Sequence, residues 1–201
     1  MVTDLLQLWV SAVPLMMSPG PAVLSVAAMG AAFGPVRALR YYIGIVAGTF
    51  SVLLVVASGL TAALLSVPGL APMITTLAAV YILYLAYRIT TAPVLSAGTG
   101  SGPRDAPSFP SGFILAIANP KAFAALGALN AGHSLLPGDP VADAAAKIGG
   151  LSCMIVVANG TWLLCGAALS KVLRDPKAGR IANFAFAVLL VASVVAAVLG
   201  R

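Results

Sequence analysis

The sequence has little charge and no glutamate. Only 8% of its 201 residues are charged, against about 25% in a typical soluble domain, and its acidic residues are five Asp. So few charges cannot cover a water-facing surface, which excludes a soluble globular protein. The two cysteines are Cys153 and Cys165. On one helix they would lie about 18 Å apart, at 1.5 Å per residue, which is too far for a disulfide.

Long apolar runs take the place of the missing charges. Apolar residues make up 61% of the chain, and the mean hydropathy is +1.06. A helix needs about 20 mostly apolar residues to cross a bilayer. Six stretches meet this need: residues 5–29, 41–65, 71–89, 111–131, 148–170 and 181–199. We therefore expect an all-α integral membrane protein with six transmembrane helices.

The basic residues predict how the chain is oriented in the membrane. Eight of them fall on one side of the six stretches: Arg37, Arg40, Arg88, Arg104, Lys171, Arg174, Lys177 and Arg180. The other side has two basic residues and three acidic ones: Lys147, Arg201, Asp4, Asp139 and Asp143. Because loops rich in Lys and Arg stay in the cytoplasm, we expect both termini to lie outside it.

Residues 91–110 divide the chain into two halves. This segment contains four Pro, three Gly and three Ser, a composition typical of a flexible linker. We expect it to be a cytoplasmic linker between residues 1–90 and residues 111–201, each with three spans. Because three is odd, structural copies would lie upside down relative to each other. Inverted repeats of this kind are typical of secondary transporters.

Two of the six stretches contain helix-breaking motifs near their middle. The first has Ser-Pro-Gly-Pro at residues 18–21, and the fourth has Asn-Pro-Lys at residues 119–121. Proline removes a backbone donor and disfavours a helical preceding residue, so we expect both helices to be broken. Irregular backbone at that depth lines a cavity or is buried, and its freed groups can bind substrate. The candidate substrate-binding residues are Pro19, Gly20, Pro21, Asn119, Pro120 and Lys121.

Lys121 is the only charged residue expected near the bilayer midplane. A charge at that depth costs at least about 2.5–3.5 kcal/mol on insertion scales and usually marks function. No acidic residue is expected at the same depth, so its partner is a carbonyl cluster, water or the carboxylate of a substrate. A purely structural bond to carbonyls is the alternative. The neighbouring Asn119 amide both donates and accepts, which suits a zwitterion.

The motifs resemble the LysE/RhtB (lysine exporter) family of bacterial amino-acid exporters. The resemblance spans nearly the whole chain and rests on these features: the proline motifs at residues 18–21 and 119–122, the spaced glycines Gly30, Gly34, Gly44 and Gly48, the aromatic stretch at residues 81–85, Phe109, Gly112, Arg180 and Asn183. It implies export across the bacterial cytoplasmic (inner) membrane, driven by the proton-motive force, with no cofactor. Two positions depart from the family pattern, since Ala22 replaces an Asn and Thr49 replaces an acidic residue found in many members.

Further polar residues and glycines fall within the spans. Thr49, Tyr81 and Tyr84 are candidate pathway-lining residues, although the tyrosines would equally suit pairing with a neighbouring helix. Gly44 and Gly48 fit close helix packing. Asn159 and Asn183 fit interhelical hydrogen bonds, and His133 is placed at the outer end of span four.

The leading interpretation is a secondary exporter of amino acids or similar small metabolites. The substrate carboxylate would meet Lys121 and the amides freed around Pro19 and Pro21, and Asn119 would hold the amino group. The partners expected are this substrate and the lipid bilayer, with no nucleic acid, no metal and a plausible homo-oligomer. A divalent-metal exporter and a non-transport membrane protein are the alternatives. An enzyme is disfavoured because the chain lacks paired catalytic groups.

Overall fold

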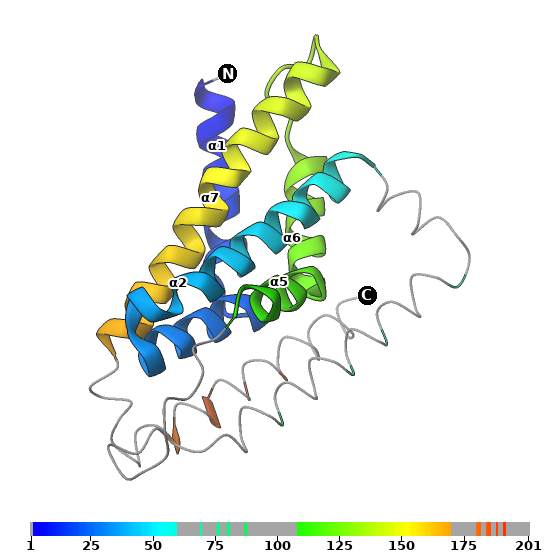
Figure 1. Ribbon diagram of the computed structural model, residues 1–201. Coiled ribbons are helices and arrows are strands. Elements are labelled where there is room, and N and C mark those ends of the chain that lie inside the picture. The colour runs from blue at the N-terminus through cyan, green and yellow to red at the C-terminus, as the bar shows by residue number, and fades with distance from the viewer. Residues whose placement is uncertain are drawn as a thin grey trace.

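The computed structural model describes residues 2–59 and 108–169, with isolated positions at 69, 76, 80, 87, 180, 181, 184, 185, 188 and 191 (Figure 1). Within these residues every regular element is a helix: α1 (Val2–Met17), α2 (Pro21–Ala57), α5 (Phe109–Ile117), α6 (Pro120–Gly132) and α7 (Pro140–Ala168). The all-α class is thus confirmed for the described part. The expected spans 71–89 and 181–199, and the linker up to residue 107, lie outside it except for isolated positions.

Helix α2 is a hairpin of two arms. Its backbone leaves the helical conformation at Gly34, which has φ 75° and ψ 165°, and Pro35 follows. Glycine tolerates this positive φ, and proline is well suited to start the next helix. On a straight helix Ser25 and Tyr41 would be about 24 Å apart along the axis. Their side-chain oxygens are instead 3.0 Å apart, so the first arm (residues 21–33) folds back on the second arm (residues 35–57), as Figure 1 shows.

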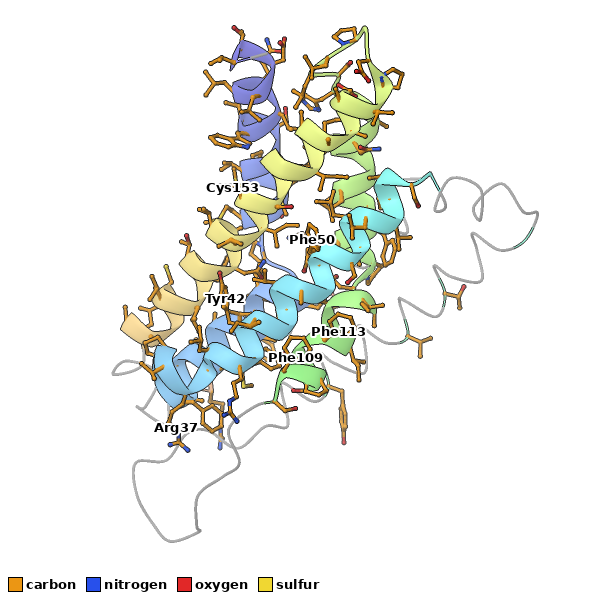
Figure 2. All side chains as sticks on the ribbon, turned by 45° about the horizontal axis from the view of Figure 1, so that its top comes forward. Arg37, Tyr42, Phe50, Phe109, Phe113 and Cys153 are labelled. Atoms are coloured by element: carbon orange, nitrogen blue, oxygen red, sulfur yellow. The ribbon has the colours of Figure 1, made fainter. Side chains whose placement is uncertain are left out.

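The second span was predicted at residues 41–65, and this register is wrong. The helix instead begins just after Gly34 and ends at Ala57. It begins earlier than predicted because Gly34 alone connects the two arms of α2. The two tyrosines that open the predicted span, Tyr41 and Tyr42, contact other helical segments. Tyr41 is buried between the two arms, and the Tyr42 hydroxyl donates to the carbonyl of Val156 in α7 at 3.0 Å (Figure 2).

Both predicted helix breaks are present. The first separates α1 from α2 at residues 18–20, and the second separates α5 from α6 at residues 118–119, where the axes bend by 59°. In each case proline is the first residue of the helix that follows. Among the described helices, α2 and α7 are long and apolar enough to cross a membrane, and the bent pair of α5 and α6 makes a third such span.

Two other boundaries differ from the prediction. Helix α7 begins at Pro140 rather than residue 148, because the Asp139 carboxylate caps it by accepting from the N–H groups of Val141 and Ala142. Helix α5 begins at Phe109, so the last two residues of the expected linker are helical. In both cases a helix starts at a proline-containing turn that hydropathy alone assigns to a loop.

Glycines hold the helices at close distance. Gly44 and Gly48 in the second arm of α2 face the backbone of α5, and a Cβ at Gly44 would overlap the carbonyl of Phe109. Gly166 in α7 likewise lies against the backbone of Ala27 in the first arm of α2. The predicted packing role of Gly44 and Gly48 is therefore confirmed. Small residues of this kind let helix backbones approach closely within a membrane.

The two ends of the described bundle differ in charge. Figure 1 places the N-terminus of α1 and the start of α7 together at one end, which therefore carries Asp4 and Asp139. Arg37 and Arg40 follow the turn of α2, and Figure 2 shows Arg37 at the opposite end. The acidic residues Asp4 and Asp139 thus lie at one end of the described bundle, and the basic Arg37 lies at the other. This distribution agrees with the assignment of these residues to opposite sides of the membrane from the sequence.

Candidate substrate site at the two helix breaks

Lys121 joins the two helix breaks. Its Nζ donates hydrogen bonds to the carbonyl oxygens of Ser18 and, at 3.4 Å, Pro19. Lys121 lies in the first turn of α6, whereas these carbonyls belong to the break more than 100 residues earlier. A carbonyl cluster, water and a substrate carboxylate were the partners expected for this charge. In the structure the ammonium contacts a cluster of backbone carbonyls. The side chain therefore bridges the two halves of the chain at their interrupted helices.

The same contacts cap the C-terminal end of α1. The last carbonyls of a helix lack intrahelical partners and carry partial negative charge. The Trp162 indole donates to the carbonyl of Met17 at 3.1 Å, and Lys121 supplies a cation to the next two carbonyls. A cation at this end of a helix is favourable, typically by about 0.3–1 kcal/mol. The end of α1 is therefore held by side chains from α6 and α7.

The helices that follow the breaks begin differently. At the start of α6, the Asn119 side-chain oxygen accepts from the backbone N–H of Lys121 at 3.2 Å. At the start of α2, the capping position is Gly20, which has extended backbone and supplies no side-chain cap. The first-turn amides of α2 at Ala22 and Val23 therefore mark an N-terminus without a side-chain acceptor. Such a helix start favours an anion.

A cavity of about 40 Å³ lies where the two breaks meet. At about 10–15 Å³ for each water molecule, it has room for a few waters in this conformation. Most of its lining is apolar, and the polar side chains come from four positions. The lining residues are Leu15, Met16, Gly20, Ala22, Val23, Thr49, Asn119, Lys121, Ala122, Ala125, Leu126, Ala158 and Asn159. An apolar cavity with a few polar groups is the usual form of a small-molecule site.

The predicted site residues are partly brought together by this cavity. Gly20, Asn119, Lys121 and Thr49 all line it. The three predicted prolines, Pro19, Pro21 and Pro120, shape the breaks beside it and are not among its lining residues. Tyr81 and Tyr84 lie outside the described residues, so their predicted role stays a prediction.

Asn159 lines the cavity, although it was not among the site residues predicted from the sequence. Its side chain is only 4% exposed, and its Nδ2 donates to the carbonyl of Ile155 at 2.9 Å. Its Oδ1 is buried and has no hydrogen-bond partner among the described residues. The sequence signal was a lone amide within the apolar stretch of α7, which we interpreted as an interhelical contact. The structure instead pairs the amide with its own helix and leaves its oxygen unpaired.

Thr49 adds a second acceptor to the cavity. Its hydroxyl donates to the carbonyl of Ile45 at 2.8 Å, and the side chain is 6% exposed. Since this bond uses the only hydroxyl proton, the oxygen can act toward the cavity only as an acceptor.

A second polar cluster lies at the far ends of α6 and α7. Lys147 Nζ pairs with Asp143 at 2.8 Å and donates to the carbonyls of Asn130 and His133. The Asp143 carboxylate also accepts from the backbone of the α6–α7 connection, and the ring of His133 lies 3.1 Å from the Ser11 hydroxyl. Asp143 and Lys147 were predicted as loop charges, but both are buried in α7 against the α6–α7 connection, where they pair with each other across one turn. Their bonds hold the connection together.

The chemistry of the cavity suits an organic zwitterion. Its polar groups are an ammonium, two amides and a hydroxyl, whereas hard cations require clustered carboxylates and softer ones thiolate or imidazole. Within the part of the chain that the structure describes, no group of three or more His, Cys or acidic residues could hold a metal ion. The metal alternative therefore has no supporting observation in the described residues.

Comparison with known protein families matches residues 13–201 to the LysE type translocators. The chain belongs to this family. The match confirms the resemblance based on the two proline motifs, and it covers both halves of the chain. No match was found among curated proteins or among solved structures. As a LysE type translocator with apolar, membrane-length helices, the protein is a multi-pass membrane transporter, and its family consists of transporters rather than enzymes.

Proposed function

We propose that this translocator exports amino acids or closely related small zwitterions from the cytoplasm, and that it binds them in the cavity between the two helix breaks. The observation that carries the proposal is the meeting of both breaks around one intramembrane lysine. A site of this kind, with broken helices near the bilayer midplane, is typical of secondary transporters.

The carboxylate of the substrate binds at the starts of α2 and α6. An ammonium has three N–H donors, and Lys121 uses two of them on the carbonyls of Ser18 and Pro19, which leaves one for a ligand. The uncapped start of α2 adds its first-turn amides and the positive end of its helix dipole. Together they supply donors and positive potential to the cavity.

Access alternates by movement of one half of the chain against the other. Both halves contain a break, a proline that starts the next helix, and then a reversal into a long helix. This shared order supports two inverted three-helix repeats, residues 1–90 and 111–201, joined by a cytoplasmic linker at residues 91–110. The protein lies in the bacterial cytoplasmic membrane with both termini outside, and the proton-motive force drives export.

The test is export from cells that overproduce the protein. The cells are loaded with dipeptides, and mass spectrometry measures the amino acids released. We expect the parent to release one class of amino acid and Lys121→Ala to release none above background. Gly127→Ala, on the same helix with no described atom within 4 Å of the added Cβ, is the matched control and should export normally.

Two results would contradict the proposal. Normal export by Lys121→Ala would remove Lys121 from the site. Release of no amino acid by the parent, despite verified insertion in the membrane, would contradict amino-acid export. Membrane yield and melting temperature of each variant show whether a lost activity reflects lost folding. Lys121→Met, which keeps most of the apolar stem, serves as a second variant if Lys121→Ala is unstable.

A further inference from the structure

The unpaired oxygen of Asn159 has a specific use in this site. We propose that Asn159 selects the substrate by accepting a hydrogen bond from its protonated amino group, so that carboxylates without this group are rejected. This inference rests on the proposed function of the cavity. It gives Asn159 the role suggested from the sequence for Asn119, whose side-chain oxygen instead accepts from the backbone N–H of Lys121. It makes Asn159 a specificity-determining residue.

The orientation of the amide follows from its neighbour. The Ile155 carbonyl can only accept a hydrogen bond, so the Asn159 atom that lies 2.9 Å from it must be the NH₂ group. The reverse orientation would place two acceptor oxygens against each other. The atom left without a partner is therefore the oxygen, in a side chain that lines the cavity.

Leaving this acceptor buried and unpaired is unfavourable. An unsatisfied buried polar group costs about 1–3 kcal/mol, and such groups are rare enough in proteins to require a cause. Asn159 gains little for the fold in exchange, because Ile155 belongs to its own helix and its carbonyl already lies within the helical hydrogen-bond ladder. An apolar side chain at this position would therefore stabilise the empty protein.

Donors and acceptors in the cavity come from different helical segments. Lys121 and the uncapped start of α2 present donors and positive charge, whereas Asn159 of α7 and Thr49 of the second arm of α2 present oxygens. A ligand with a carboxylate at one end and an ammonium at the other satisfies both sets. A carboxylate that lacks the amine would satisfy Lys121 but leave Asn159 unpaired. Sites with buried acceptors discriminate strongly against ligands that lack the matching donor.

The test measures binding of matched ligand pairs to the purified, full-length protein. Each pair is an amino acid and its deaminated acid, such as alanine with propionate or leucine with 4-methylpentanoate, and binding is followed by isothermal titration. The variant is Asn159→Leu, which removes the acceptor at similar size. Thr161→Val is the matched control, because Thr161 makes the same bond to its own helix two residues away and does not line the cavity.

We expect the parent and Thr161→Val to prefer the amino acid over the deaminated acid. Asn159→Leu should lower that preference about 10- to 150-fold, the value of one hydrogen bond to a charged group. Without ligand, Asn159→Leu should also melt at a higher temperature than the parent.

Each contrary result has a distinct meaning. An unchanged preference in Asn159→Leu overturns the role of Asn159 and leaves the proposed function intact. An Asn159→Leu protein that fails to fold, or melts lower than the parent without ligand, shows that the amide is structural and also overturns the inference. If the parent binds neither member of any pair, the proposed function itself is wrong.

Discussion

Substitution of Gly20 by alanine would displace Lys121 without altering it. A Cβ built at Gly20 lies 2.6 Å from Lys121 Cδ and 3.1 Å from Nζ. Ordinary contact begins near 3.4 Å, so the lysine stem would have to move by about 0.8 Å at its closest atom (3.4 minus 2.6). The backbone of Gly20 is extended, with φ −169°, and alanine adopts this conformation without strain. The substitution therefore acts mainly on the position of the ammonium.

The expected loss of export depends on the two hydrogen bonds that Lys121 Nζ donates to the carbonyls of Ser18 and Pro19. The bond to Pro19 is already long at 3.4 Å, and a displacement of about 0.8 Å removes it or weakens both. A hydrogen bond to a charged group contributes about 1.5–3 kcal/mol. If the misplaced ammonium also loses its contact with the substrate, export at low substrate concentration should fall about 10- to 150-fold.

Export by Gly20→Ala is measured beside the parent and Gly127→Ala, with the membrane yield of each protein determined in parallel. Because the obstructed atoms belong to a flexible side chain, we expect normal yield with impaired export. Export equal to the parent would show that the position of Lys121 is irrelevant and would refute the reasoning.

Two further predictions concern the fold. Gly166→Ala should destabilise the protein by about 1–3 kcal/mol through overpacking, because the new Cβ meets the backbone of Ala27. Gly149→Ala on the same helix, where the described part of the chain places no atom within 4 Å of the new Cβ, should not. Thermal melting in detergent compares them, and equal melting temperatures would contradict the packing. Asp143→Asn should lower the melting temperature, because it removes the carboxylate that pairs with Lys147 Nζ at 2.8 Å and leaves the lysine only its carbonyl partners. The double variant with Lys147→Met should recover part of this loss, and if it recovers none, the pair is not the cause.

The proline motifs could be interpreted from the sequence because their chemistry is local. A proline lacks an N–H group wherever it lies, so both breaks and the helix starts at Pro21 and Pro120 follow without tertiary information. A single lysine in an apolar stretch is also costly in any arrangement, which identified Lys121. The family resemblance depended on the same motifs.

Other features could not be predicted because they depend on which helices become neighbours. The hairpin of α2 depends on one positive φ at Gly34, and hydropathy averages over such a turn. Tyr41 resembles an interfacial aromatic until Ser25 is placed opposite it. The burial of Asp143 and Lys147 depends on the path of the α6–α7 connection.

Asn159 shows the same limit at the site. Its residue type allowed either a ligand contact or an interhelical bond. Only the bond to Ile155 and the unpaired Oδ1 distinguish the two. The sequence thus shows that a polar residue lies within a membrane helix. Only the structure shows that its oxygen has no partner among the described residues.

The central claim is that substrate occupies the cavity between the breaks, and protection of a cysteine in that cavity tests it most directly. Ala125 lines the cavity, and the exposed native cysteines Cys153 and Cys165 are first replaced by serine. Labelling of Ala125→Cys by N-ethylmaleimide in membranes is timed with and without an equimolar pool of the proteinogenic amino acids. Gly138→Cys, in the α6–α7 connection away from the cavity, is the control. We expect the amino-acid pool to slow the labelling of the cysteine at position 125 and to leave the labelling rate at position 138 unchanged. Equal rates at position 125 with and without the pool would contradict the central claim.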